Sequence, residues 1–214
     1  MSIAVAVRKD GQISLVTDSQ TNMGSERVPP ENFADTKRCT IGDAHVAATG
    51  WSLYSNILDD VLSRRRRLPR LDDELSIFKF FNELWKILHD DYSFVKDQSG
   101  EGDSPFGSLD SSFLIASPRG LFSVSSDLSV TRYQRYFAIG SGAPVALGAV
   151  HALYDGDGDA ETVASRAAQA AIAHDIYCGP PLNVITVRER AGRAPRDASP
   201  TRRRAASAAP AKRR

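Results

Sequence analysis

The sequence predicts an α+β fold in which antiparallel sheets are covered by pairs of helices. Strand-like segments cluster together and helical segments cluster together, in the order ββββ-αα-βββ-αα-β along 214 residues. This order differs from the alternation of strand and helix that is typical of parallel sheets. Hydrophobic residues make up 42% of the chain, which is enough for the core of one sizeable domain.

The first four strands are expected to form two hairpins. Apolar runs rich in β-branched residues flank two turn signals, Asp10-Gly11 and Gly42-Asp43. The four runs cover residues 3–7, 13–17, 37–41 and 45–49. Because chain ends usually fray, a strand that begins almost at residue 2 would hold the start of the chain at a fixed point on a sheet.

Two helices are expected next, over residues 51–67 and 72–95, because apolar residues recur there at helical spacing. In the first helix these residues are Trp51, Tyr54, Leu58, Val61 and Leu62. In the second they are Leu75, Phe78, Leu84, Leu88 and Tyr92. We expect both sets to face the core.

The second half of the chain is expected to add a hairpin, a further strand, a helix pair and a closing strand. These elements are predicted at 111–116, 121–124, 135–139, 143–154, 161–174 and 182–187. One domain therefore covers residues 1–188. Residues 189–214 are rich in Ala, Pro, Ser and Arg without an apolar period, so they are predicted to form a disordered basic tail.

Charge is divided unevenly between these two parts. Residues 188–214 contain ten basic and two acidic side chains, a net charge of +8. The other 187 residues contain 17 basic and 24 acidic side chains, a net charge of −7. The tail could contact phosphate groups by charge alone, but it lacks the interleaved aromatic residues of a specific single-strand reader. Nucleic acid is therefore not expected as a partner.

Several other classes of protein are disfavoured. No apolar run reaches about 18 residues, so no membrane span is expected, and the start lacks the features of a signal peptide. Cys39 and Cys178 do not form a disulfide framework, which indicates a cytoplasmic protein with reduced thiols. The aspartates at 155, 157 and 159 lack the glycine and glutamate of a calcium loop, and the histidines lack metal-ligand spacing. We expect no metal and no organic cofactor.

Ser2 is the first candidate for chemistry. A small second residue permits removal of Met1, and no propeptide is expected, so Ser2 would then carry both a hydroxyl and a free α-amine. A serine hydroxyl needs an adjacent base to act as a nucleophile. An α-amine, with a reference pKa of about 7.7–8.0, can be that base near neutral pH. Met-Ser is also simply a common way for a chain to begin.

Three further candidates stand at the ends of expected strands. Lys37 begins the second hairpin, and its ammonium would lower the pKa of the Ser2 amine if the two strands are adjacent. Asp18 could hold Lys37 in place. Gly50 lies at a strand-to-helix junction, where its N–H could stabilise a developing oxyanion. The simpler alternatives are a surface lysine, a strand-end turn and a turn glycine.

Two polar residues near the later helices complete the candidates. Ser141 lies in the sequence Ile-Gly-Ser-Gly-Ala-Pro between a strand and a helix, where it could equally serve as an N-cap. Asp175 begins the sequence Asp-Ile-Tyr-Cys-Gly before the last strand.

In this order, residues 2–187 resemble proteasome β-type subunits and the related bacterial protease HslV. The resemblance rests on the hairpin start, the segment from Asp18 to Gly24, the lysine before the second hairpin, Thr49-Gly50, and the two motifs just described. The run Asp-Ser-Gln-Thr-Asn at 18–22 is closest to the bacterial ancestral-type β-subunit and the betaproteobacterial proteasome homologue, and we favour the latter.

The resemblance implies a four-layer αββα sandwich of the N-terminal nucleophile hydrolase type. It implies a peptidase subunit of a self-compartmentalising ring in which Ser2 is the nucleophile. The other implied catalytic positions are Asp18 and Lys37, which tune Ser2, the oxyanion-hole residue Gly50, and the supporting residues Ser141 and Asp175. The implied substrate-binding positions are Gln20, Asn22, Ala48 and Ser52.

The implied partners are copies of the chain in stacked rings of roughly 12 or 14 subunits, polypeptide substrates, and an ATP-dependent unfoldase. In such a ring the arginines at 64–67 and Arg70 could line a pore or meet an acidic neighbour, or they form a solvated helix end.

Two departures from the family leave an alternative open. Serine lacks the methyl group that restricts the rotamer of the family's threonine, and Cys178 replaces a supporting serine. The chain could therefore form a weakly active or inactive ring that serves as a scaffold or binding chamber. A third possibility is a non-peptidase amidase on the same architecture.

Overall fold

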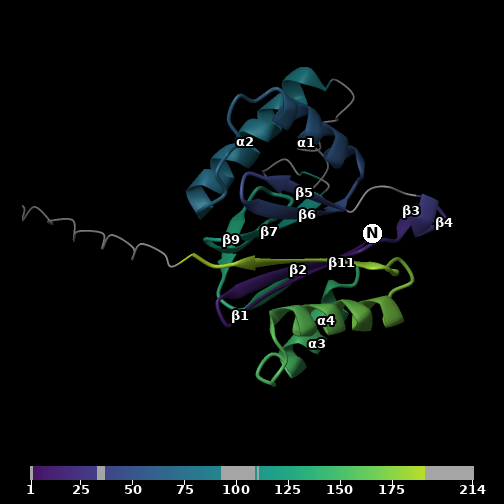
Figure 1. Ribbon diagram of the computed structural model, residues 1–214. Helices are drawn as coiled ribbons and strands as arrows, with labels where there is room; N and C mark the ends of the chain where they lie inside the picture. The colour runs from purple at the N-terminus through teal and green to yellow at the C-terminus, as the bar shows by residue number, and fades with distance from the viewer. Residues whose placement is uncertain (1, 33–36, 93–108, 110, 191–214) are drawn as a thin grey trace, which may run out of the picture.

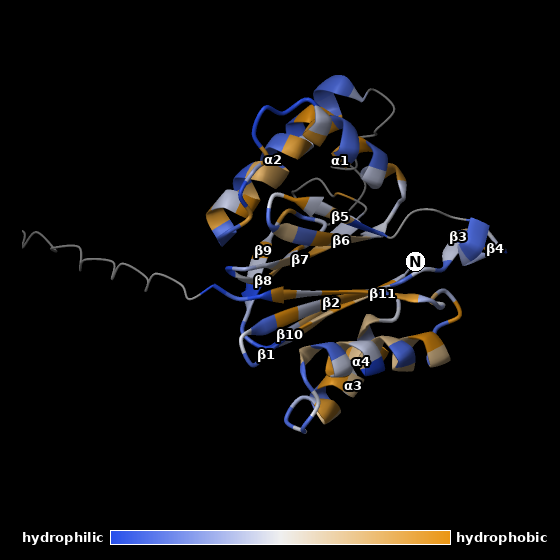
Figure 2. Cartoon of the chain, in the orientation of Figure 1, coloured by the Kyte–Doolittle hydropathy of each residue, from blue (hydrophilic) through white to orange (hydrophobic). Residues whose placement is uncertain are grey.

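The computed structural model describes residues 2–32, 37–92, 109 and 111–190. Two antiparallel sheets lie face to face, and a pair of helices covers the outer face of each sheet (Figure 1). The expected four-layer αββα sandwich is therefore confirmed. Hydrophobic residues concentrate on the strands between the layers, and hydrophilic residues predominate on the outer loops and helix faces (Figure 2).

The first sheet has the strand order β10-β1-β2-β11 and contains the start of the chain. Its strands are β1 (Ile3–Lys9), β2 (Gln12–Asp18), β10 (Tyr136–Gly140) and β11 (Leu182–Arg188). Side chains alternate across a strand, so Ile3, Val5 and Val7 of β1 pack toward the helices while Ala4 and Ala6 pack toward the second sheet. Burial on both faces explains why this strand reads as a continuous apolar run.

The second sheet has the strand order β5-β6-β7-β8-β9. Its strands are β5 (Arg38–Ile41), β6 (Ala44–Gly50), β7 (Ser111–Ser117), β8 (Gly120–Val124) and β9 (Val130–Tyr133). A separate small hairpin is formed by β3 (Thr21–Met23) and β4 (Glu26–Val28), and a 3-10 turn covers Pro30–Asn32. The sequence did not predict β3, β4 or β9, because each is short and largely polar.

The helix pairs differ in how they pack on their sheets. The helices are α1 (Leu53–Ser63) and α2 (Glu74–Asp91) on the second sheet, and α3 (Ala143–Leu153) and α4 (Ala160–His174) on the first (Figure 1). Asp73 caps α2 by accepting a 2.7 Å hydrogen bond from the Ser76 N–H. Five of the six buried residues of α4 are alanines, so this helix can approach the first sheet closely.

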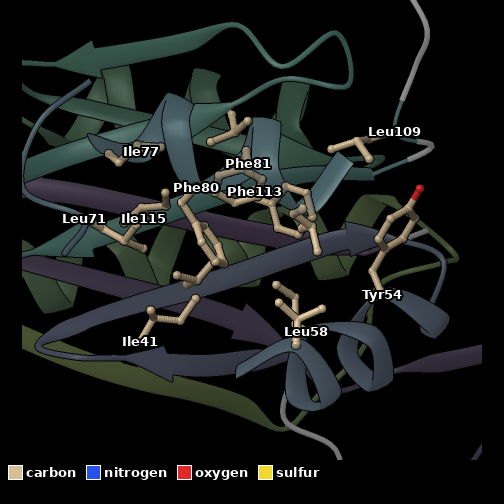
Figure 3. Packing of buried hydrophobic residues seen from close by; sticks show 14 of the residues in the cluster. Ile41, Tyr54, Leu58, Leu71, Ile77, Phe80, Phe81, Leu109, Phe113 and Ile115 are labelled. Carbon is tan, nitrogen blue, oxygen red and sulfur yellow. The ribbon is translucent and has the colours of Figure 1, made fainter. Parts of the chain in front are cut away.

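The helical faces predicted for α1 and α2 are partly wrong. Tyr54 and Leu58 are buried, but Trp51 lies before α1 and is 69% exposed. In α2, Leu75 and Phe78 are exposed, while Leu84 and Leu88 are buried as predicted. Ile77, Phe80 and Phe81 pack into the core as well (Figure 3). The spacing identified a helix correctly, but two adjacent apolar stripes left its rotation undecided.

Some predictions about the chain ends and surface stay predictions. The tail at 189–214 lies outside the described residues apart from its first two, and the Glu189 N–H donates a 2.9 Å hydrogen bond to the Gly11 carbonyl. No helix in the described ranges is long and apolar enough to cross a membrane. The arginine cluster begins after α1 ends, and three of its members form ion pairs. These pairs are Arg64 with Asp60 and Asp91, Arg65 with Glu83, and Arg70 with Asp72.

Replacing Phe81 with alanine should lower the free energy of unfolding by about 3–5 kcal/mol, because the ring is fully buried against Phe80 and Phe113. Phe78→Ala is the matched control on the same helix. Its ring is 43% exposed, so a loss below about 1 kcal/mol is expected. Chemical denaturation measures both, and equal losses would contradict the observed rotation of α2.

Candidate active site

Ser2 lies at the head of β1, next to the residue pair Ile3–Gly140 of the first sheet. Its residue is only 6% exposed, yet it lines a cleft of about 620 Å³. The same cleft is lined by the β3 segment, the end of β6 and the residues that lead into α1. The start of β1 therefore places a hydroxyl at the wall of a cavity large enough for part of a ligand.

The Lys37 ammonium lies beside the Ser2 hydroxyl. Lys37 Nζ donates hydrogen bonds to Ser2 Oγ at 3.0 Å, to Asp18 Oδ1 at 2.8 Å and to the Gln20 carbonyl oxygen at 2.5 Å. The Asp18 side chain is fully buried and that of Lys37 is 12% exposed. A cation held this close to a hydroxyl favours the oxyanion form of that hydroxyl, which suits an activated nucleophile.

The backbone of Lys37, from which this side chain extends to Ser2, is strained. Its φ is +54°, a left-handed conformation that costs a residue other than glycine of order 1–3 kcal/mol. The Ala48 N–H donates a 3.2 Å hydrogen bond to the Lys37 carbonyl and ties it to β6. Lys37 therefore precedes β5, which begins at Arg38, and does not start that strand as predicted.

Asp18, the last residue of β2, has a carboxylate whose two oxygens accept four hydrogen bonds. Oδ1 accepts from Lys37 and from the Ile3 N–H at 3.1 Å, while Oδ2 accepts from the Gln20 N–H at 3.2 Å and the Gly179 N–H at 3.1 Å. A buried carboxylate is tolerated only when it is paired and hydrogen-bonded in this way. Asp18 thus holds Lys37 and fixes the chain next to Ser2 at the same time.

Ser141 lies on the other side of Ser2. Its Oγ donates to the Ser2 carbonyl oxygen at 3.4 Å, and the Gly142 N–H donates to the same oxygen at 3.5 Å. The alternative in which Ser141 caps α3 is wrong, because Gly142 occupies the N-cap position and no side chain caps that helix. The single proton of the Ser141 hydroxyl is shared instead between the Ser2 carbonyl and the Asp175 carboxylate.

Asp175 is held as a carboxylate behind Ser141. Burial raises its pKa, but hydrogen bonds from the Ser141 hydroxyl and from the Tyr177 N–H at 2.9 Å outweigh burial, so the pKa lies below its ordinary value. The Cys178 thiol also donates to Asp175 Oδ2 at 3.5 Å. Burial and the nearby carboxylates of Asp18 and Asp175 raise the pKa of Cys178 to about 12, so the thiol stays protonated and can keep donating.

Two glycines that sequence reasoning did not select allow the chain to close around Ser2. Gly140 has φ +101°, and a Cβ at this position would lie 2.1 Å from the Ser2 carbonyl oxygen. A Cβ at Gly142 would lie 2.9 Å from Ala171 Cβ and 3.1 Å from Cys178 Sγ. The repeated glycines around Ser141 were the available signal, because glycine is favoured where backbones approach closely.

The cleft wall holds the remaining predicted residues. Gly50, Ala48 and Ser52 all line the cleft together with Ser2, and Gly50 has φ +129°, which L side chains rarely adopt. Trp51 and Met23 also line it and are 69% and 60% exposed, although the sequence had not indicated either as a site residue. Within the described part of this lining, Lys37 is the only charged residue.

Gln20 and Asn22 line the cleft as well, but their side-chain amides are engaged elsewhere. Gln20 Nε2 donates to the Ile176 carbonyl at 2.8 Å, and Asn22 Nδ2 donates to the Tyr177 carbonyl at 3.2 Å. Both amides therefore face the loop between α4 and β11. Their predicted role in binding a substrate stays a prediction.

A comparison of the chain with models of known protein families finds no match. Among curated proteins, "Proteasome subunit beta" of Nanoarchaeum equitans is 29% identical over 201 residues, which cover 89% of this chain and 94% of that protein. "Proteasome subunit beta 1" of Caldivirga maquilingensis is 39% identical over 75 residues. That second alignment spans 34% of this chain and 36% of the length of the relative.

Solved structures resemble the chain over most of its length. BPH of Thiobacillus denitrificans is 32% identical, and the match covers 88% of this chain and 98% of BPH with a TM-score of 0.82. BPH in complex with epoxomicin gives the same TM-score of 0.82, with 30% identity and 100% coverage of BPH. HslV of Trypanosoma brucei, at 22% identity and a TM-score of 0.63, shares the fold.

Gly140→Ala should lower the free energy of unfolding by at least about 1–3 kcal/mol. The new methyl group would collide with the Ser2 carbonyl, and alanine disfavours the φ of +101° that this position requires. The control is Gly148→Ala in α3, where no atom lies within 4 Å of the added Cβ. That change should be neutral or stabilise by about 0.5–1 kcal/mol. Thermal unfolding compares the two variants, and a harmless Gly140→Ala would contradict the tight approach at Ser2.

Proposed function

The chain belongs to the proteasome β-type subunit family, and from this premise we propose that it is a peptidase subunit with Ser2 as its nucleophile. The observation that best supports the proposal is the 3.0 Å hydrogen bond from Lys37 Nζ to Ser2 Oγ, with the buried Asp18 carboxylate 2.8 Å from the same ammonium. Such an arrangement activates a hydroxyl that is otherwise a weak nucleophile.

The proposed reaction begins after removal of Met1. The α-amine of Ser2 accepts the proton of Ser2 Oγ, and Oγ forms a bond to the carbonyl carbon of a peptide. The Lys37 ammonium, which stays hydrogen-bonded to Asp18, stabilises negative charge on Oγ as the proton leaves. Ser141 and Asp175 hold the Ser2 main chain from the other side.

The tetrahedral intermediate carries an oxyanion, which the Gly50 N–H is proposed to stabilise. Collapse of the intermediate breaks the carbon–nitrogen bond, and the leaving amine takes the proton from the α-amine. Water then attacks the ester formed on Ser2 while the α-amine again accepts a proton. The bond between the carbonyl carbon and Oγ breaks, Oγ takes that proton back, and the second peptide is released as a carboxylic acid. This scheme uses residues of the chain alone.

The exchange of a supporting serine for Cys178 is compatible with this scheme. Because the pKa of Cys178 is raised to about 12, the thiol remains neutral near pH 7 and donates to Asp175 as a hydroxyl would, although more weakly. The departure from the family pattern therefore weakens one hydrogen bond and introduces no thiolate beside the site.

We further propose that copies of the chain assemble into stacked rings of roughly 12 or 14 subunits in the cytoplasm. An ATP-dependent unfoldase would deliver polypeptide substrates to the enclosed cleft. The relative named as a proteasome subunit supports assembly into a multi-subunit complex. The number of subunits and the unfoldase are proposed from the family resemblance.

Ser2→Ala should lower kcat/KM for peptide hydrolysis by at least about a thousandfold, because the attacking oxygen is removed. Fluorogenic peptides measure the rate, and intact mass spectrometry first establishes that Met1 has been lost from both proteins. Ser2→Thr is the control, since it keeps the hydroxyl and should stay active. Equal hydrolysis by wild type and Ser2→Ala would refute the nucleophile.

The complex of BPH with epoxomicin offers an independent probe of the same cleft. Epoxomicin should add its mass to the wild-type chain and leave Ser2→Ala unmodified. A wild-type chain that assembles into a ring but neither hydrolyses peptides nor reacts with epoxomicin would favour the scaffold or binding chamber instead.

Trp51→Ala should raise KM about 5- to 30-fold for peptides with large apolar side chains near the cleaved bond, while kcat changes less than about 3-fold. Burial of the exposed indole face against such a side chain is worth about 1–2 kcal/mol. Leu75→Ala, in α2, removes another exposed apolar side chain, one outside the cleft lining, and should change neither constant. If Trp51→Ala instead prevents the subunits from assembling into the oligomeric ring, the residue lies in a subunit contact.

A further inference from the structure

Residues 175–179, the first five of the seven residues between α4 and β11, touch both sides of the Ser2 site. We call them the bridge loop. At one end, the Gly179 N–H donates to Asp18 Oδ2 at 3.1 Å, and the Gly179 carbonyl accepts from the Ser19 N–H at 3.1 Å. At the other end, Asp175 hydrogen-bonds with Ser141, which contacts the Ser2 carbonyl. A shift of this loop would therefore move groups on both sides of Ser2.

The middle of the bridge loop is held by side-chain amides. Gln20 Nε2 donates to the Ile176 carbonyl at 2.8 Å and to Asn22 Oδ1 at 2.9 Å, and Asn22 Nδ2 donates to the Tyr177 carbonyl at 3.2 Å. The Ile176 side chain is 81% exposed, so hydrophobic packing within the chain does not anchor this point of the loop. We call the pair Gln20 and Asn22 the amide clamp.

Gln20 joins the amide clamp directly to Lys37. Its carbonyl oxygen accepts the 2.5 Å hydrogen bond from Lys37 Nζ, and its N–H donates to Asp18 Oδ2 at 3.2 Å. The side chain, the carbonyl and the N–H of one residue thus contact the bridge loop, the lysine and the aspartate respectively. Rotation of the Gln20 backbone would remove one of the three oxygens that hold the ammonium beside Ser2.

The clamp is kept at a cost to stability. Gln20 Oε1 is buried and has no hydrogen-bond partner among the described residues, in a residue that is only 1% exposed. An unsatisfied buried oxygen is unfavourable for folding. A Cβ at Gly179 would lie 2.3 Å from Gln20 Oε1, so a side chain at this position would displace the Gln20 amide. An apolar side chain of similar length would avoid the unsatisfied oxygen but would leave the Ile176 carbonyl and Asn22 Oδ1 without this donor, so the amide serves to hold the bridge loop.

We propose that Gln20, together with Asn22, is a positioning residue: the amide clamp fixes the bridge loop and orients the carbonyl that holds Lys37 Nζ beside Ser2. The predicted effect on kcat rests on the proposed peptidase function. The two side chains are thereby assigned to the internal geometry of the site and not to contact with substrate.

Gln20→Met in the full chain tests the proposal. It keeps the length of the side chain, removes both donated hydrogen bonds and removes the unsatisfied oxygen. We expect kcat for a fluorogenic peptide to fall roughly 10- to 100-fold, as it does when groups that orient a reacting residue are lost, with KM changed less than about 3-fold. The melting temperature should fall slightly, because the Ile176 carbonyl and Asn22 Oδ1 lose their donor. A purely structural role predicts a lower melting temperature with kcat unchanged, and a substrate-binding role predicts a raised KM. Either result, or an unchanged kcat, would overturn the proposal.

Asn183→Ala is the matched control. Asn183 Nδ2 donates a 2.7 Å hydrogen bond to Ser19 Oγ, in the segment that also carries Gln20, but it does not contact residues 176–177 by a side-chain hydrogen bond. Its loss should leave kcat within about 2-fold of wild type. Asn22→Leu should reproduce the Gln20→Met effect to a smaller extent, because one of the two clamped carbonyls keeps its donor.

Hydrogen exchange separates this proposal from the proposed function. In Gln20→Met, the backbone amides of residues 177–179 should exchange at least about 10-fold faster than in wild type, whether or not the chain hydrolyses peptides. Unchanged exchange would disprove the clamp even in an active enzyme. A wild-type chain without peptidase activity, but with faster exchange in the variant, would disprove the peptidase and leave the clamp in place.

Discussion

The buried carboxylate of Asp18 is the constraint on which the rest of the site depends. A charge with no exposure to water must be matched by donors, and here one ammonium and three backbone N–H groups provide the match. Those donors come from β1, from the segment after β2, from the bridge loop and from Lys37. Satisfying one carboxylate therefore brings the end of β2, Lys37 and the bridge loop to the head of β1, where Ser2 lies.

Close approach of backbone to backbone is the second requirement, and small residues provide it. Gly140 and Gly142 let the strand-to-helix junction reach the Ser2 carbonyl, and Gly179 lets the bridge loop reach Gln20. The alanines of α4 bring the helix that carries Asp175 close to β1 and β2. Two other features of the site are unfavourable for folding when taken alone: the left-handed backbone of Lys37 and the buried Gln20 oxygen that accepts no hydrogen bond from the described residues. Such departures concentrate at functional sites, where geometry is kept at the expense of stability.

The cleft beside Ser2 has a chemical character of its own. Lys37 is the one charged residue in the described lining, and it is already paired with Asp18. The cleft therefore offers no free charge to pair with a charged side chain that enters. Small residues such as Gly50, Ala48 and Ser52 leave space along the wall, while Trp51 and Met23 present exposed apolar surface. A chain segment with large apolar side chains fits this surface better than a charged one.

The sequence by itself determined the order of most strands and helices along the chain, because continuous apolar runs, helical spacing and turn residues are local signals; the four-layer arrangement followed from the family resemblance. It also indicated Ser2, Asp18 and Lys37 by their places at strand ends, whereas the need for glycine at 140 and 142 emerged only from the structure. The rotation of α2, the exposure of Trp51 and the short strands β3, β4 and β9 were decided only in the tertiary structure, since spacing gives the period of an element but not which of two apolar stripes finds a partner. The hydroxyl of Ser141 turned to Ser2 and not to the helix end for the same reason: hydrogen bonds between residues distant in sequence follow from packing, which no local pattern records.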